Sequence, residues 1–158
     1  MKPFLLAATA VLLTAPANAA DRVAPTGKWM VGLEERGCTL FREFSGNGED
    51  YSLHVTPDPN SGKTELVVLH KARGTDYASL NAALLIDGGE SVTLHRLERF
   101  PRNSGWVRYG LMLDDTDMLA RVNNGLAIDA GRVLNVELAT GSMAAAIAAL
   151  QTCVAEEG

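Results

Sequence analysis

The chain has 158 residues, of which 47% are hydrophobic and 21% are charged. These proportions are typical of one globular domain, and they exclude a disordered tail, a collagen-like rod and a protein with several membrane spans. The 19 acidic side chains outnumber the 14 Lys and Arg, for a formal net charge of −5. This balance argues against a nucleic-acid-binding protein, because such proteins gather positive charge on one face.

The first 19 residues follow the three-part pattern of a secretory signal peptide. Lys2 gives a positive start, residues 4–13 form a mainly apolar run, Pro16 interrupts any helix, and 17–19 offer small residues for a signal peptidase. The run is too short to span a membrane, and a buried N-terminal helix is the alternative interpretation. We predict cleavage after the last of these residues. The mature domain, residues 20–158, is then a single β-rich domain in the periplasm or secreted, with no transmembrane segment.

The two cysteines, Cys38 and Cys153, lie near opposite ends of the mature chain. An oxidising compartment makes their pairing the expected state. A reactive thiol or a metal pair is the alternative, but no CxxC motif and no neighbouring His supports it. A disulfide that closes a loop of roughly 100 residues is worth at most about 4.7 kcal/mol by chain entropy. We expect it to pin the last helix to the second expected strand.

Short apolar runs separated by turn residues predict a domain made mainly of strands. Apolar and polar residues alternate at 51–56, the period-2 pattern of a half-buried strand, and the continuous apolar run 66–69 predicts a strand covered on both faces. Further strands are expected at 29–33, 38–41, 80–86, 92–95, 107–113, 126–128 and 133–138, and turns at 45–48, 57–62, 87–90 and 100–105. Strands joined at this spacing predict an antiparallel β-sandwich or barrel.

Two helices are expected between and after these strands. Asp115 or Thr116 can cap a short inserted helix, and Ser142 can cap a C-terminal one. The apolar stripe that packs the final helix on the core consists of Met143, Ile147, Leu150 and Val154. The expected fold is therefore mainly β, with a short inserted helix and a C-terminal helix packed on it.

No catalytic signature is present, since the chain lacks a GxSxG nucleophile elbow, an HExxH zinc motif, a P-loop and a GxGxxG turn. This lowers the expectation of an enzyme, but a site assembled in space would leave no such motif. His95 with Asp114 or Asp115 is the pair that such a site would use. No catalytic residue is predicted.

Metal and cofactor sites are also not predicted. His54, His70 and His95 lie on separate expected strands, without the close spacing that zinc ligands usually show. Residues 114–117, Asp-Asp-Thr-Asp, resemble the opening of a calcium loop but lack the Gly and the distal Glu of an EF-hand. We interpret these acidic residues as the start of the short helix.

The best functional candidate is the segment 95–109, which combines Arg with aromatic residues in an acidic chain. Guanidinium groups and aromatic rings suit an anionic ligand, a sugar or a protein partner. The alternative is a solvated hairpin whose arginines pair with the many carboxylates of the chain. The candidate ligand- or partner-binding residues are Arg96, Arg99, Arg102, Trp106, Arg108 and Tyr109.

Two short motifs carry a family resemblance. Gly37-Cys38-Thr39-Leu40 and the closing pattern G-S-x-x-A-A-x-x-x-L-x-x-C at 141–153 resemble a group of small exported proteins of sphingomonad-type alphaproteobacteria. More distantly, residues 126–150 are similar to the end of the invasion-associated locus B family of periplasmic β-rich domains. The resemblance implies export and a β-rich fold with a terminal helix. It supplies no catalytic residues.

Three functions follow as hypotheses, in this order. The first is a non-enzymatic binding or accessory protein of the cell envelope, with an unidentified envelope component or protein as partner. The second is a hydrolase with a spatially assembled site. The third is an inhibitor of a secreted hydrolase, because a rigid disulfide-linked β-domain suits the presentation of a loop such as 57–62.

Overall fold

Each expected strand has a counterpart in the structure, together with one strand that the sequence pattern does not predict. Of the strand expected at 92–95, residues 92–93 lie outside the described residues, and the strand continues to 101, so the turn expected at 100–105 begins later. The computed structural model describes residues 20–72, 77–89, 94–101 and 105–157. Its elements in chain order are β1 (Asp21–Pro25), β2 (Met30–Glu34), β3 (Gly37–Gly46), β4 (Glu49–Asp58), β5 (Lys63–His70), β6 (Ala78–Ile86), β7 (Leu94–Pro101), β8 (Val107–Leu113), α1 (Asp117–Ala120), β9 (Leu126–Asp129), β10 (Asn135–Leu138) and α2 (Ala144–Glu157). The mainly β fold with a short inserted helix and a C-terminal helix is confirmed. Neither of the described helices is long and apolar enough to cross a membrane.

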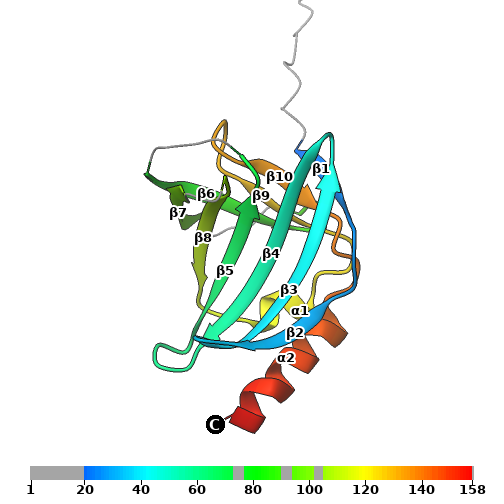
Figure 1. Ribbon diagram of the computed structural model, residues 1–158, viewed down its shortest axis with the longest axis vertical. Coiled ribbons are helices and arrows are strands. Elements are labelled where there is room, and N and C mark those ends of the chain that lie inside the picture. The colour runs from blue at the N-terminus through cyan, green and yellow to red at the C-terminus, as the bar shows by residue number, and fades with distance from the viewer. Residues whose placement is uncertain (1–19, 73–76, 90–93, 102–104, 158) are drawn as a thin grey trace, which may run out of the picture.

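Of the two expected architectures, the chain adopts the barrel (Figure 1). Nine strands close it in the order β1-β10-β9-β6-β7-β8-β5-β4-β3, and β1 pairs again with β3. All these neighbours are antiparallel except β1 and β10, which are parallel. β5 pairs with β8 and β6 pairs with β9. In the order of the barrel, two strands therefore separate β5 from β6, and two separate β8 from β9.

β1 and β2 pair with different halves of β3. Residues 30–34 of β2 lie opposite 37–41, whereas Ala24 and Pro25 of β1 lie opposite Ser45 and Phe44. β1 also pairs with β10 and so closes the barrel, while β2 has no second neighbour among the described strands. The pattern of β1 is hard to recognise in the sequence, because only one of its five residues is buried.

The barrel interior is filled by alternate residues of the strands. Tyr51, Leu53 and Val55 are buried as the alternation predicts. In the run 66–69, Leu66 and Val68 are fully buried on the inner side, whereas on the outer side Val67 is 8% exposed and Leu69 is half-buried. The largest fully buried side chains are Phe44, Leu40, Leu53, Leu66, Leu84, Leu97, Leu111, Leu113, Leu119, Leu126, Ile128 and Leu138. The core therefore runs through the barrel and continues under the two helices.

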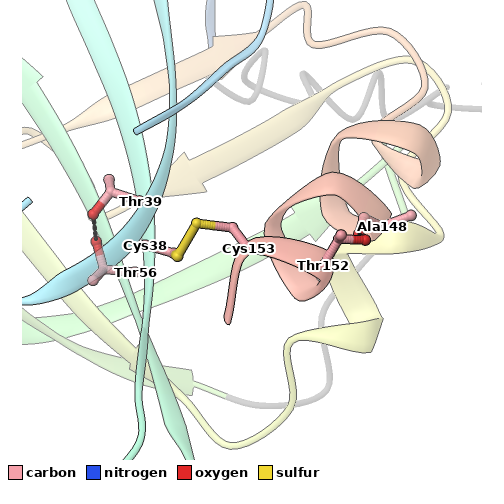
Figure 2. The surroundings of a disulfide bond; sticks show 6 residues. All are labelled: Cys38, Thr39, Thr56, Ala148, Thr152 and Cys153. Carbon is pink, nitrogen blue, oxygen red and sulfur yellow. Dashed lines mark hydrogen bonds between the residues drawn. A yellow bond between two sulfur atoms is a disulfide. The ribbon is translucent and has the colours of Figure 1, made fainter. Parts of the chain in front are cut away.

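α2 covers one end of the barrel, and the predicted stripe faces the core. Met143, Ile147 and Leu150 are buried, and Val154 packs against them. The predicted disulfide between Cys38 and Cys153 forms, with Cα atoms 6.0 Å apart, and ties α2 to the start of β3 (Figure 2). This β3 is the second strand expected from the sequence, so that expectation is confirmed.

Two local expectations are refined by the structure. β4 extends to Asp58, so the expected loop 57–62 is shorter, because Pro57 lies beyond the last β4 residue paired with β3 and its missing N–H costs no hydrogen bond on that side. At α1, Thr116 makes no side-chain capping bond. The Asp115 carboxylate instead accepts a bond from the Asp117 N–H at 2.7 Å.

Candidate functional site

The predicted Arg- and aromatic-rich segment forms the β7–β8 hairpin, whose alternation directs its side chains to two faces. Tyr109 is 3% exposed and points into the barrel, where its hydroxyl donates to the Val133 carbonyl at 3.3 Å. Arg99 alternates in phase with the fully buried Leu97, and so belongs to the same inner side. These two candidate residues are therefore separated from the outer face of the barrel.

The outer face of the hairpin carries two of the remaining candidates. Arg96 and Arg108 point outward, and the Arg108 guanidinium lies 5.7 Å from the ring centre of Phe100. Trp106 is half-buried at the edge of a separate hollow of about 250 Å³ beside β4. Arg102 lies outside the described residues. The hairpin thus does not gather its candidates into one cluster.

Arg108 instead belongs to a cluster built from three distant segments. It donates to one carboxylate oxygen of Glu65 on β5, and Arg36, from the β2–β3 turn, donates to the other oxygen at 2.6 Å. The Arg108 and Glu65 side chains are only 18% and 15% exposed. A network with this little exposure is less screened by water than an isolated surface ion pair. We call these three residues the outer-face cluster.

A glycine makes the reach of Arg108 possible. A Cβ atom on Gly110 would lie 2.8 Å from the Arg108 Nη1 atom, so the guanidinium lies directly over the backbone of this residue. In the β5–β8 pairing Arg108 lies opposite Leu69, and Gly110 lies opposite Val67, one step nearer to Glu65 along the strands. By crossing over Gly110, the Arg108 guanidinium reaches Glu65. Any larger residue at Gly110 would push Arg108 away from the cluster.

A hollow of about 290 Å³ lies beside the cluster. It is lined by Glu34, Arg36, His54, Thr56, Glu65, Val67, Leu69 and Arg108. The His54 ring stacks on Phe41 at 5.8 Å and its Nε2 atom lies 2.8 Å from the Ser52 hydroxyl. The hollow therefore combines two guanidinium groups, the carboxylates of Glu34 and Glu65, an oriented imidazole and an apolar surface. This set of groups suits a carboxylate or phosphate attached to a small apolar body.

Arg96 is engaged in a second arrangement on the same face. Glu98 accepts hydrogen bonds from the hydroxyls of Ser79, at 2.6 Å, and Tyr77, and from Arg96 Nε at 3.2 Å. These bonds, from Ser79 first and then Tyr77, lower the pKa of Glu98 below its usual value. Arg96 thus resembles the solvated, paired arginine of the alternative interpretation.

The tip of the β4–β5 hairpin stands among three further hollows. Their volumes are about 400, 390 and 180 Å³, and Pro57 lines each of them. The tip is braced by Asp58, whose carboxylate accepts bonds from the Asn60 N–H at 3.0 Å and the Ser61 hydroxyl at 2.7 Å. These bonds lower the pKa of Asp58. The loop proposed for inhibition is therefore braced by two hydrogen bonds to one carboxylate.

The acidic residues before α1 bond to residues other than His95. Asp114 pairs with Lys63 at 3.0 Å, and Asp115 accepts the N–H of Asp117. Within the described ranges, no three His, Cys, Asp or Glu side chains gather closely enough to hold a metal ion. Within the described part of the chain, the pairing of His95 with Asp114 or Asp115 is not among the hydrogen bonds or ion pairs.

The candidate set from the sequence omits the residues that complete the outer-face cluster. Arg36, Glu65 and Gly110 carry no local motif, and His54 was expected only as a solvent-facing strand residue. Alternation alone places Glu65 and Arg108 on the outer face, because each follows or precedes a buried neighbour. Their contact depends on the β5–β8 pairing, for which no short sequence signal exists.

Comparisons with protein-family models, with curated proteins and with solved structures find no match to this chain.

Proposed function

We propose that this chain is an exported, non-enzymatic binding or accessory protein of the cell envelope that engages its partner through the outer face of β4, β5 and β8. The observation that carries the proposal is the outer-face cluster, in which the largely covered Glu65 and Arg108 are joined by the exposed Arg36, beside a hollow of about 290 Å³. Export is supported by the signal-peptide pattern of residues 1–19 and by the disulfide.

The outer face is a better candidate than the barrel interior. Large aliphatic side chains such as Leu53, Leu66 and Leu111 fill the interior and are at most 1% exposed. A ligand in that space would have to displace core residues, each worth several kcal/mol of stability (about 2–5 for Leu to Ala). On the outer face a ligand displaces only water and surface contacts.

The cluster favours an anionic group in the partner. Arg36 and Arg108 already hold one carboxylate, that of Glu65, so their spacing is suited to a group with two oxygen atoms. Val67 and Leu69 offer an apolar surface next to this position. An acidic side chain of a protein partner, or a small carboxylate or phosphate compound, meets both requirements.

The test is a capture experiment from periplasmic extract with the oxidised mature protein. The double variant Arg36→Ala/Arg108→Ala removes both guanidinium groups, and Arg96→Ala is the matched control on the same face. We expect the double variant to bind the captured partner at least about tenfold more weakly, as for a central charged contact, and the control to bind it as the wild type does. Circular dichroism and a free-thiol assay verify folding.

Equal binding by the double variant would remove the outer face as the binding site. Loss of binding in Arg96→Ala alone would move the site to the Glu98 arrangement. If neither the wild type nor any variant retains a partner, the same variants are titrated with small dicarboxylates and phosphate monoesters. Absence of binding there would reject the proposal.

An inhibitor of a secreted hydrolase is a second candidate function, favoured by the braced tip at 57–62. Rigid loops bind enzymes well because little conformational entropy is lost on binding. Asp58→Ala removes both bracing bonds, and on this hypothesis it weakens inhibition of a lysozyme or protease while Arg36→Ala/Arg108→Ala does not. The opposite pattern would favour the outer face.

A further inference from the structure

β2 has an open edge. It pairs with β3 through residues 30–34, and no described strand covers its other side. Met30 is 53% and Leu33 is 62% exposed. Natural sheets protect such edges with charged residues, prolines or bulges, because a free edge can pair with another chain. Between Met30 and Leu33 this strand has none of these protections.

The sequence around the edge is complementary to itself. Residues 28–34 read Lys-Trp-Met-Val-Gly-Leu-Glu, with Val31 at the centre. Reversing the segment about this residue puts the positive Lys28 opposite the negative Glu34, and the large Met30 opposite Gly32. Neither Lys28 nor Glu34 forms an ion pair with another described residue.

We propose that two copies of this chain pair antiparallel through their β2 edges, about a two-fold axis at Val31. A two-fold interface uses one patch twice, so each contact occurs in two copies. Lys28 lies opposite the partner's Glu34, and Met30 opposite the partner's Gly32. In this register the numbers of two opposite residues differ by an even number. The two side chains of each pair therefore lie on the same face of the joined sheet.

The two faces of this joined edge have different character. Met30, Gly32 and Glu34 alternate with Val31 and Leu33, which are in phase with the buried Leu40 and Cys38 of β3. By this alternation Met30 and Glu34 lie on the outer face, and Val31 and Leu33 lie on the inner one. The pairing of Lys28 with the partner's Glu34, and of Trp29 with the partner's Leu33, extends β2 by two residues at its start. The missing side chain of Gly32 leaves room for the Met30 side chain of the other copy.

The pairing would also change the surroundings of the outer-face hollow. Glu34 lines that hollow, so the partner's Lys28 would lie at its rim in the dimer. The inference does not rest on the proposed function, because it depends on the edge and on the charges of residues 28–34. The two proposals are tested by different variants and fail separately.

The experiment is sedimentation velocity of the oxidised mature protein over a wide range of concentrations. The wild type is expected to show a concentration-dependent dimer. Lys28→Glu and Glu34→Lys each place like charges opposite one another twice, and should weaken dimerisation about tenfold, from two unfavourable cross-strand pairs. The double variant Lys28→Glu/Glu34→Lys restores opposite charges in both pairs and should regain the wild-type dimer.

Arg132→Glu is the matched control, because it changes the net charge as Lys28→Glu does at an exposed residue away from β2. A wild type that stays monomeric at every concentration would overturn the proposal. So would single variants that dimerise as well as the wild type, a double variant that does not recover, or an equal loss in Arg132→Glu. Binding of an extended foreign peptide to a monomeric wild type would assign the edge to another partner.

Discussion

The two halves of β3 are anchored in different ways. Its second half pairs with β1, which also pairs with β10 and is thereby held on both sides. Its first half pairs with β2, which has a free edge, and is fixed by the disulfide from Cys38 to Cys153 in α2. The second half of β3 is therefore held by strand pairing that closes the barrel, and its first half by a covalent link to α2.

Arg42 lies where the two arrangements meet. Its Nε donates to the Gly27 carbonyl at 2.7 Å and its Nη1 to the Thr140 carbonyl at 2.8 Å. The guanidinium carbon also lies 5.4 Å from the Trp29 ring centre. Burial lowers the pKa of this guanidinium. The side chain thus links the segment between β1 and β2 to the segment that follows β10, through carbonyls of residues that lie outside the strands.

The largest expected effect comes from removal of the covalent anchor. In Cys38→Ser/Cys153→Ser we expect the free energy of unfolding to fall by about 4 kcal/mol, as for the loss of a disulfide that closes a long loop. Urea unfolding measures this change. Hydrogen exchange should show a greater loss of protection in β2 and residues 37–41 than in β1. Equal loss in both regions would contradict the division of β3 into separately anchored halves.

An intermediate effect distinguishes the closing strand from the edge strand. Val23 of β1 is 1% exposed, whereas Leu33 of β2 is 62% exposed. Val23→Ala should cost about 2 kcal/mol by loss of buried apolar surface, and Leu33→Ala less than about 0.5 kcal/mol. Thermal and urea unfolding of the two variants, at a concentration where the protein is monomeric, give the comparison. A similar cost for both would mean that β2 is covered.

The smallest expected change in stability at neutral pH concerns Tyr51, which lies opposite Phe44 in the half of β3 that pairs with β1. Burial first, and then the charges of Glu49 and Asp21, raise its pKa from 10.0 to about 12. Because the folded state has the higher pKa, the neutral phenol contributes its full stability below pH 10, and this contribution is lost between pH 10 and about 12.

The variant Tyr51→Phe tests this contribution, because it retains the ring that stacks on His70 at 4.3 Å. We expect the free energy of unfolding of the wild type to fall more steeply than that of the variant as the pH rises through this window. Parallel curves would show that the Tyr51 hydroxyl does not titrate with the raised pKa.

Much of the fold could be predicted because its signals are local. The alternation at 51–56, the apolar run at 66–69 and the stripe of the last helix each occupy one short segment, and each is confirmed. The disulfide could be predicted because only two cysteines exist. β1 could not, since Val23 is its one buried residue and its main neighbour is β10, at the other end of the chain.

The candidate site was predictable only in part, for the same reason. Arg96 and Arg99 are three residues apart, and on a strand this spacing puts them on opposite faces. Their separation onto two faces could therefore be predicted from the sequence alone. The contact of Arg108 with Glu65 depends on β5 pairing with β8 rather than with β6, and that choice is made by the packing of the whole barrel.

The parallel pairing of β1 with β10 has a consequence for the order of folding. A chain that grows from its N-terminus cannot complete the barrel until residues 135–138 have been synthesised, so β1 waits for the last strand to find its second neighbour. Contacts between such distant segments raise the contact order and slow folding. The closed barrel is therefore a property of almost the entire sequence, since no shorter N-terminal part contains both strands of the closing pair.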